Sequence, residues 1–290
     1  MKPAPFDYLA PTTLEHALAL KAEYGDEAKF LAGGQSLIPA MNFRLVQAAR
    51  LIDVNGLTGL AEMAVTDGEL HLGALCRHRA VERATTVARY APLLAEAMPF
   101  VAHPQIRTRG TLGGSLAHAD PAAELPVVAL ALDAKFKAQS VRGERWIAAR
   151  DFFKGFFTTD LASDEMLTEV ALPPLPARTG TAFIEFSRRR GDYAILGVAA
   201  LVTLNESGVC QSARLVFLNA GDGPMDAPRA AALLVGGTLT AEAVGATAHA
   251  VDAEIAPSGN VHASSAYQRH LARVLTKRAL TKAFERAKEN

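Results

Sequence analysis

The stretch Ala32-Gly33-Gly34-Gln35-Ser36-Leu37 directly follows the strand-like run Lys29-Phe30-Leu31 and leads into a helical pattern. Adjacent glycines can adopt positive φ and let backbone amides approach a ligand closely. The Ser36 hydroxyl and the amides that begin the next helix can donate to phosphate oxygens. We interpret this loop as an anion-binding cradle. It lacks the G-x-G-x-x-G pattern, so it does not predict a Rossmann-type NAD site.

A second loop further along the chain is expected to repeat the same donor chemistry: Thr111-Leu112-Gly113-Gly114-Ser115-Leu116-Ala117-His118-Ala119-Asp120-Pro121. A dinucleotide such as FAD needs donors for its pyrophosphate, and it needs polar groups for its ribose, ribityl chain and adenine. Either loop alone could be an ordinary tight turn. Two such loops that converge on one ligand would supply both requirements, and we therefore expect a dinucleotide site.

Composition limits the kinds of partner. The chain has 290 residues, of which 50% are apolar and 21% charged, which is enough for two ordinary globular domains. Thirty Lys and Arg residues balance thirty Asp and Glu residues, so no global positive field attracts nucleic acid or an anionic membrane. We see neither a signal peptide nor an apolar run that could span a bilayer, and we expect a cytoplasmic protein.

Strand-like and helical patterns alternate in the first part of the chain. We expect a helix over residues 13–24 with a hydroxyl cap, and strands over 29–32, 51–54 and 70–73. Helical spacing returns at 91–101 and at 122–132, and the second of these helices is expected to begin with Asp120 as cap and Pro121 in the first helical position. Strands are expected at 134–140 and 145–149.

A proline-rich run, Leu172-Pro173-Pro174-Leu175-Pro176, cannot continue a helix or a central strand and is the best candidate for a domain linker. Beyond it, residues 181–188, 196–205 and 213–220 read as antiparallel strands. The last stretch, 264–290, has an apolar stripe and a basic face. It is interpreted as a docking helix with a solvated face, with a partner-binding surface as the alternative. The fold class is α+β.

The two glycine loops resemble the FAD-binding medium subunit of the xanthine dehydrogenase and carbon monoxide dehydrogenase family, the molybdenum hydroxylases. The likeness extends to Phe6-Asp7-Tyr8, to Arg188-Arg189-Arg190-Gly191-Asp192-Tyr193-Ala194 and to Ser265-Ala266-Tyr267-Gln268-Arg269. It implies a vanillyl-alcohol-oxidase-like (PCMH-type) FAD-binding domain over residues 1–176, with lobes at about 1–55 and 56–176. A smaller α+β domain over 177–290 would follow.

The resemblance also implies a set of cofactor-binding residues and no catalytic or metal-binding ones. The pyrophosphate and ribityl region would be lined by Lys29, Ala32, Gly33, Gly34, Gln35, Ser36 and Leu37. The rest of the dinucleotide would contact Thr111, Gly114, Ser115, Asp120 and Glu124, the last standing where many relatives carry aspartate. The backbone of Leu167 would lie beside the flavin. Tyr193 would form an aromatic wall against the isoalloxazine, and a tyrosine packed on its own sheet is the alternative.

The cysteine count indicates that iron-sulfur clusters would have to be bound by a different chain. Each [2Fe–2S] cluster takes about four thiolates, and this sequence has only Cys76 and Cys210. We read both as buried thiols, so the clusters would have to lie on another polypeptide. The resemblance implies a small iron-sulfur subunit for the clusters and a large molybdenum subunit for the molybdopterin-type cofactor. The resemblance implies a dimer of heterotrimers that passes electrons through FAD to an external acceptor.

Two other functions were weighed. A self-contained flavin oxidoreductase of the same fold superfamily would need a substrate cap with a catalytic His, Tyr or Ser, and we see no such insert. A scaffold that has lost its cofactor would be colourless when purified. His103 and His118 lack metal-ligand spacing, so we read them as solvated or hydrogen-bonded. The acceptors that the resemblance allows are NAD, oxygen, a quinone and a cytochrome.

Overall fold

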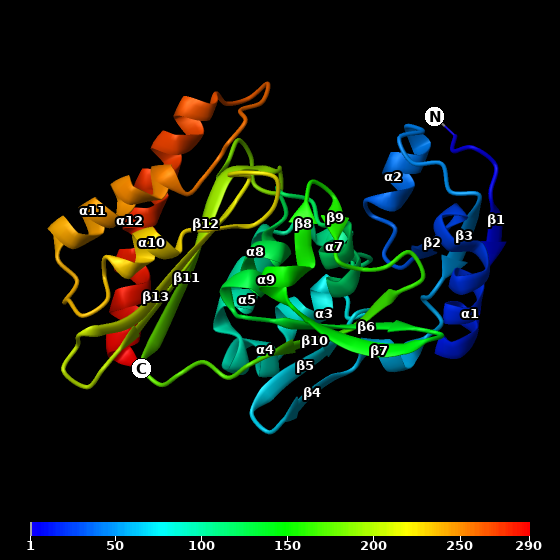
Figure 1. Ribbon diagram of the computed structural model, residues 1–290, viewed down its shortest axis with the longest axis horizontal. Coiled ribbons are helices and arrows are strands. Elements are labelled where there is room, and N and C mark those ends of the chain that lie inside the picture. Colours follow the sequence, from blue (N-terminus) through cyan, green and yellow to red (C-terminus); the bar gives the residue numbers. More distant parts are fainter. Residues whose placement is uncertain (1) are drawn as a thin grey trace.

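The computed structural model describes residues 2–290, and its N-terminal lobe is built on a small parallel sheet in the order β1-β3-β2 (Figure 1). The elements are β1 (Asp7–Leu9), α1 (Leu14–Tyr24), η1 (Gly25–Glu27), β2 (Ala28–Leu31), α2 (Leu37–Asn42) and β3 (Arg50–Asp53). The Thr13 hydroxyl caps α1 by accepting from the His16 amide, as predicted. Because β2 and β3 are parallel, their carboxyl ends meet at one edge of the sheet.

The second lobe has an antiparallel five-stranded sheet in the order β4-β5-β10-β6-β7. Its strands are β4 (Met63–Thr66), β5 (Glu69–Gly73), β6 (Lys135–Ser140), β7 (Gly143–Ala148) and β10 (Met166–Leu172). Between them run η2 (Thr58–Ala61), α3 (His78–Arg83), α4 (Thr85–Tyr90), α5 (Pro92–Ala97), η3 (Met98–Phe100), α6 (Pro104–Arg107), α7 (Leu112–His118), α8 (Glu124–Ala131), α9 (Ala149–Phe152), β8 (Phe153–Gly155) and β9 (Thr158–Thr159). Leu72, Phe136 and Val170 of the sheet share a core with Leu94, Leu116 and Val128 of the helices.

Two expected helices differ from the structure. The expectation that Asp120 caps a helix with Pro121 in its first position is wrong, because α8 begins at Glu124 after a cap at Ala123 with no side-chain hydrogen bond. Asp120 Oδ1 instead accepts from the Ala122 amide at 2.9 Å, which closes a turn before the helix. The segment expected at 91–101 divides into α5 and η3 near Pro99, which has no amide to continue the helical ladder.

The C-terminal part is an antiparallel sheet in the order β11-β12-β13-β14, with a long helix across one face (Figure 1). The strands are β11 (Thr179–Ser187), β12 (Ala194–Leu204), β13 (Cys210–Leu218) and β14 (Met225–Asp226). The helices are α10 (Pro228–Ala232), α11 (Ala241–Ala250), η4 (Val251–Ala253) and α12 (Ser265–Glu289). Every position of β12 is buried, because α12 covers one face of the sheet and the second lobe packs on the other.

Glu96 of α5 joins the second lobe to the C-terminal part. Its carboxylate lies 2.5 Å from Lys282 Nζ and 2.6 Å from Arg286 Nη1, both on α12, and it accepts from the Phe183 amide at 3.2 Å. This carboxylate therefore ties together a helix of the second lobe, strand β11 and helix α12. Within residues 2–290, no helix combines the length and apolar character needed to cross a membrane.

Candidate functional site

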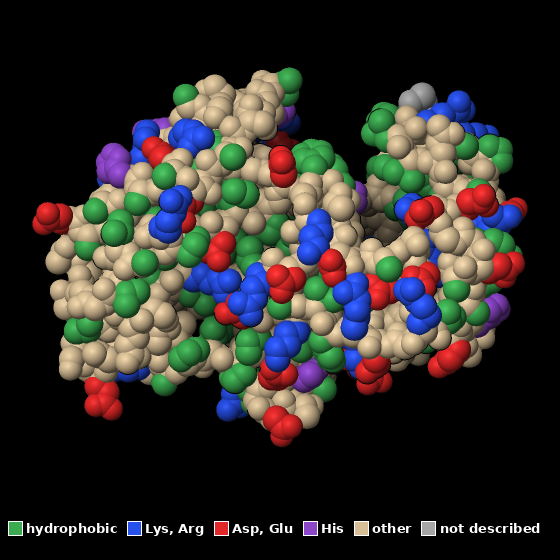
Figure 2. Space-filling view, viewed as in Figure 1, with side chains coloured by type: hydrophobic (Ala, Val, Ile, Leu, Met, Phe, Trp, Pro, Cys, Tyr) green, Lys and Arg blue, Asp and Glu red, His purple; other side chains and the backbone are tan. Residues whose placement is uncertain are grey.

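The structure brings the two glycine loops into direct contact. A Cβ added at Gly33 would be 2.5 Å from the carbonyl oxygen of Arg109 and 2.7 Å from the Cα of Gly110. One added at Gly114 would lie 4.0 Å from the Ala32 Cβ. Figure 2 shows the molecule hollowed between the N-terminal lobe, which carries α2, and the region of α7 and β9. The loops meet where these two parts approach each other.

The first loop presents donors that the protein does not use. Within residues 2–290, the four consecutive amides of Gly33, Gly34, Gln35 and Ser36 have no hydrogen-bond partner. Gly34 has φ +70°, and the Gln35 side chain donates to the Gly33 carbonyl at 3.1 Å and tightens the turn. Ser36 is exposed and its hydroxyl makes no cap bond to α2. Such a row of unpaired amides and a hydroxyl suits phosphate oxygens.

The second loop differs from what its sequence led us to expect. Its amides are already satisfied: Leu112 N donates to the Cys76 carbonyl at 2.9 Å, and Gly113 N donates to the Ala74 carbonyl at 2.8 Å. Gly114 N and Ser115 N donate to the hydroxyl and carbonyl of Thr111, which caps α7. The expectation that this loop repeats the amide chemistry of the first is therefore wrong.

The glycines of the second loop allow close packing. A Cβ at Gly113 would collide with Ala74, and neither Gly113 nor Gly114 has positive φ; among the four paired glycines, only Gly34 does. What this loop leaves for a ligand is the exposed surface of Gly114 and the half-buried side chain of Ser115. The second loop is thus a closely packed surface, and the first loop supplies the free hydrogen-bond donors.

His78 supports the second loop from behind, and our reading of the sequence did not single it out. Its ring Nε2 lies 2.9 Å from the Thr111 carbonyl, and its amide donates to the Gly110 carbonyl at 2.9 Å. Burial lowers the pKa of His78 to about 4, so the ring is neutral at pH 7. With a carbonyl as partner, the proton lies on Nε2, and His78 fixes the Gly110–Thr111 peptide.

Asp53 and Asn55 were also missed, although the sequence contained a signal for them. Asp53 ends β3, the strand beside β2, and Asn55 follows it. In open sheets with parallel strands, ligands bind outside the carboxyl ends of those strands. Asn55 Nδ2 donates to the Ala32 carbonyl at 2.9 Å, directly beneath the first loop. Burial alone would raise the pKa of Asp53, but hydrogen bonds from Tyr8 and Asn55 lower it, so this group is a carboxylate.

A second group of predicted residues lies where the second lobe meets the C-terminal part. Glu124 is buried, and burial together with the nearby charge of Asp120 raises its pKa to about 7. Glu185 of β11 has a pKa raised to about 8 by burial and by Glu124. Tyr193 follows Gly191 (φ +86°) and is 71% exposed rather than packed on its own sheet. Partial burial of its hydroxyl end and the charges of Asp120 and Glu124 raise the pKa of the Tyr193 phenol.

The remaining predicted residues lie at different distances from the loops. Leu37 begins α2 and packs with the small core around Met41. Leu167 is buried in β10 at a bulge, and the next residue, Thr168, accepts from the Ala74 amide at 2.9 Å, which connects this strand to Gly113. Lys29 is exposed on β2, three residues before Ala32 in the chain. The structure gives Lys29 no contact with either glycine loop among the described hydrogen bonds and ion pairs.

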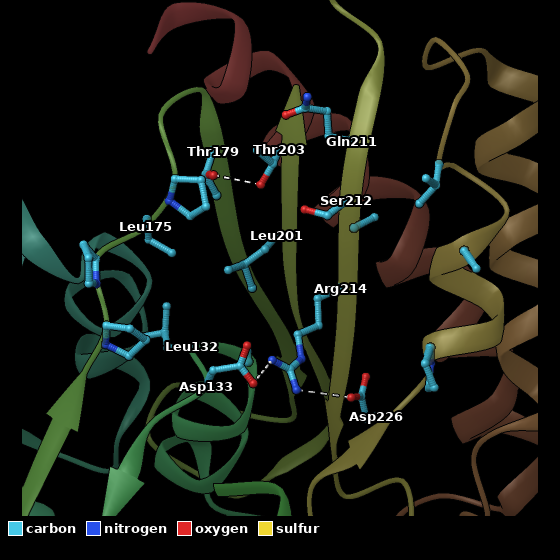
Figure 3. Close-up of a pocket in the computed structure, with 18 residues that line it drawn as sticks. Leu132, Asp133, Leu175, Thr179, Leu201, Thr203, Gln211, Ser212, Arg214 and Asp226 are labelled. Atoms are coloured by element: carbon cyan, nitrogen blue, oxygen red, sulfur yellow. Dashed lines mark hydrogen bonds and ion pairs between the residues drawn. The ribbon is translucent and has the colours of Figure 1, made fainter. Parts of the chain in front are cut away.

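A cavity of about 440 Å³ lies elsewhere, between the proline-rich linker and the sheet of β11, β12 and β13 (Figure 3). Several of its polar groups pair with one another: Arg214 lies 2.5 Å from Asp133 and 3.4 Å from Asp226, and the hydroxyls of Thr179 and Thr203 are 2.8 Å apart. It contains no residue of either glycine loop. A flavin with a charged pyrophosphate has a better match in the open hollow of Figure 2.

The described part of the chain, residues 2–290, contains no cluster of three or more His, Cys, Asp or Glu side chains placed to hold a metal ion. Cys76 and Cys210 are both buried free thiols, and burial raises the pKa of Cys76 to about 11. His118 packs its ring against Phe157 at 4.9 Å between centroids.

Comparison with known proteins gives the class of the fold. The family model for the FAD binding domain in molybdopterin dehydrogenase matches residues 4–175, and that for the CO dehydrogenase flavoprotein C-terminal domain matches 181–283. The chain belongs to the FAD-binding medium subunits of the molybdenum hydroxylase family. The predicted two-domain α+β FAD-binding fold is confirmed.

Individual relatives align over nearly the whole chain. The 6-hydroxypseudooxynicotine dehydrogenase complex subunit alpha of Paenarthrobacter nicotinovorans is 46% identical, over 99% of this chain and 97% of that protein. A chain of carbon monoxide dehydrogenase from Hydrogenophaga pseudoflava superposes with a TM-score of 0.96 at 35% identity, over 99% of both chains. A chain of quinoline 2-oxidoreductase from Pseudomonas putida 86 gives 0.94 at 36% identity, again over 99% of both.

Proposed function

We propose that this chain binds one FAD noncovalently across the contact between its glycine loops and uses it as an electron relay within a larger enzyme. The observation that carries the proposal is the row of four unpaired amides at residues 33–36, held against a second loop whose amides at residues 112–115 are used within the protein. Backbone amides need partners, and four neighbouring amides that find none within the protein can donate to the anionic oxygens of a ligand.

The residues present fit such a cofactor. The amides of Gly33 to Ser36 and the Ser36 hydroxyl would hold the pyrophosphate, with Ala32, Leu37 and Gly114 shaping the surface around it. Glu124 has a pKa of about 7, so near neutrality a large share of it carries a proton that it can donate to a sugar hydroxyl. Ser115 and Asp120 would complete the polar wall, and Thr111, which is buried, would support that wall as the cap of α7. The Leu167 backbone would flank the flavin, and Tyr193 would cover its outer face. Lys29 would reach the pyrophosphate from the strand before the loop.

Bound FAD supplies the ability to accept electrons singly or in pairs and to return them in either form. The chain's own residues would bind and orient the flavin, with Tyr193 against its outer face. With two buried cysteines, the chain cannot ligate a [2Fe–2S] cluster. In the proposal the clusters and the molybdenum cofactor therefore lie on a small and a large partner subunit.

Further parts of the proposal concern assembly. We place the complex in the cytoplasm as a dimer of heterotrimers that delivers electrons to an external acceptor. Residues 1–176 would form the FAD-binding domain, with lobes at about 1–55 and 56–176, and residues 177–290 the C-terminal domain. Support for this division comes from the irregular run at Pro173–Pro176, which separates β10 from the C-terminal sheet.

The test is anaerobic stopped-flow absorbance of the flavin, with and without the partner subunits. The purified chain should release free FAD on heating or acid treatment. Alone, it should leave its flavin oxidised when N-heteroaromatic or aldehyde substrates are added, and with both partners the flavin should bleach rapidly. Rapid reduction of the lone chain by an organic substrate would reject the relay and favour the self-contained oxidoreductase. A covalently retained flavin, or FMN in place of FAD, would contradict the loop assignment.

A further inference from the structure

A chain of polar contacts crosses between the two lobes directly behind the glycine loops. On the first lobe, the Tyr8 hydroxyl donates to Asp53. The other oxygen of Asp53 accepts from the Asn55 amide at 2.9 Å and from Asn55 Nδ2 at 2.6 Å. The same Nδ2 donates to the Ala32 carbonyl at 2.9 Å. Asn55 is thereby held in one orientation, with its side-chain oxygen turned away from its own lobe.

Arg77 of the second lobe closes the chain. Its Nη2 donates to Asn55 Oδ1 at 2.6 Å, and its Nη1 donates to the Arg109 carbonyl. The carbonyl of Arg109 is the atom against which Gly33 packs most closely. One guanidinium therefore holds the two backbone segments that meet at Gly33, one directly and the other through Asn55. A planar guanidinium with several donors can make both bonds at once, whereas an ammonium on a flexible stem does not reproduce this geometry.

The charged groups at the loop contact also favour an anionic ligand. Arg77 is partly buried, and burial together with the positive charge of Arg109 lowers its pKa from the ordinary arginine value. Asp53 is the carboxylate that acts on Arg77. The surroundings of the loop contact are thus positive, which suits a dianionic pyrophosphate. Removing Asn55 changes no charge, so its effect separates positioning from electrostatic attraction.

We propose that Asn55 and Arg77 are positioning residues that set the separation of the two glycine loops and thereby determine FAD affinity. The inference rests on the proposed function, because it assigns a role in the same site. Neither side chain belongs to an apolar core: Asn55 is exposed and Arg77 half-buried. Their removal therefore loosens the cradle and leaves the cores of both lobes in place.

The experiment compares Asn55→Ala, Arg77→Ala and the double variant in the full chain. Matched controls are Asn205→Ala, whose side chain accepts two backbone amides in the β12–β13 turn, and Arg229→Ala, which bonds a carboxylate and a carbonyl. FAD is titrated into each apoprotein by flavin fluorescence. Each single variant should raise the Kd about 10- to 100-fold, and the controls should stay within about twofold of the parent.

The double variant decides whether the two residues act as a unit. If Asn55 and Arg77 hold one bridge, the Kd of the double variant for FAD should be close to that of the single variant with the larger Kd, because the second substitution removes no further contact of the bridge. Effects that multiply would overturn the proposal, and so would single variants that titrate like the parent while their melting temperatures match the controls.

Hydrogen exchange of the apoprotein tests the bridge without the cofactor. Asn55→Ala, a substitution in the first lobe, should speed hydrogen exchange at the protected amides of residues 110–115 in the second lobe. The control Asn205→Ala should leave exchange at these amides unchanged. A parent chain that binds no FAD would reject the proposed function, and exchange would still decide whether Asn55 couples the loops. Unchanged exchange at 110–115 would overturn the positioning role even if FAD binds.

Discussion

Gly33 lies against Arg109 with no room for a side chain: a Cβ at position 33 would be 2.5 Å from the Arg109 carbonyl oxygen and 2.7 Å from the Cα of Gly110. Both neighbours are backbone atoms, so neither can rotate away as a flexible side chain would. The two lobes can therefore approach this closely only because residue 33 has no Cβ.

Gly33→Ala should weaken FAD binding strongly, because the added methyl group pushes the two loops apart. Overpacking of this kind costs about 1–3 kcal/mol. We expect a similar loss in FAD binding free energy, measured by fluorescence titration of the apoprotein. The control is Gly245→Ala in α11, where an added Cβ meets nothing within 4 Å. Unaltered FAD affinity in Gly33→Ala would show that the loop contact is irrelevant to the cofactor.

Ser36→Ala should have a milder effect that is confined to cofactor binding. The hydroxyl is exposed and caps no helix, so the apoprotein should keep its melting temperature. Losing one hydrogen bond to a charged phosphate costs about 1.5–3 kcal/mol of FAD binding free energy. Isothermal titration of parent and variant, with Ser207→Ala in the β12–β13 turn as control, measures the difference. A lower apoprotein melting temperature with unchanged FAD affinity would assign Ser36 a structural role.

Glu124 should make the apoprotein less stable as the pH rises. Its folded pKa is about 7, above the ordinary value of 4.5, so its contribution is fully present below pH 4.5 and is lost as the pH rises through 7. The shift corresponds to a loss on the order of 3 kcal/mol in unfolding free energy. Glu124→Gln should flatten this dependence. Urea unfolding between pH 5 and 8.5 measures it, with Glu185→Gln as a comparison for the neighbouring carboxyl; equal slopes in parent and Glu124→Gln would contradict the assignment.

Glu96→Ala should destabilise the packing of the C-terminal part on the second lobe. The substitution leaves Lys282, Arg286 and the Phe183 amide without their shared acceptor. Because both cations are partly exposed, we expect about 1–3 kcal/mol of unfolding free energy rather than the larger cost of a fully buried pair. Asp151→Ala, which breaks an exposed pair with Arg150, should change stability by less than about 0.5 kcal/mol. Equal losses in the two variants would remove the special role of Glu96.

Tyr193→Ala should alter the delivery of electrons to the acceptor more than the binding of FAD. The ring is exposed on a loop of the C-terminal part, and its removal opens the face that it would cover. In the reconstituted complex, flavin reduction by substrate should keep its rate, whereas reoxidation by oxygen or a quinone should change at least severalfold. Tyr193→Phe keeps the ring and should behave like the parent. A Tyr193→Ala variant that loses FAD and keeps its acceptor preference would place the tyrosine in cofactor binding alone.

The local parts of the site could be read from the sequence. Gly34 does take positive φ, Thr13 does cap α1, and the loop after β2 does present unpaired donors, because each of these depends on a few neighbouring residues. The amides of Leu112 and Gly113 could not be assigned in this way. Their partners, Cys76 and Ala74, precede them by a whole group of helices and meet them only once the lobe is packed.

Asn55 and Arg77 escaped detection for a related reason. Each lies in a different lobe, and nothing in its own neighbourhood requires the other. The expected helix start at Asp120 was wrong because an aspartate before proline suits a cap and a turn equally well, and in the structure its Oδ1 closes a turn with the Ala122 amide. Sequence patterns identified the donors of the site, and tertiary packing selected the residues that hold those donors in place.

The exposed ring of Tyr193 stands on the β11–β12 connection, whereas the unpaired amides of residues 33–36 belong to the first lobe. These two properties are thus carried by segments of the chain that recombination can exchange separately. On the proposed function, we therefore expect a chimera that takes residues 177–290 from a relative with a different oxidant to show that relative's choice of oxidant and to keep the FAD affinity of this chain.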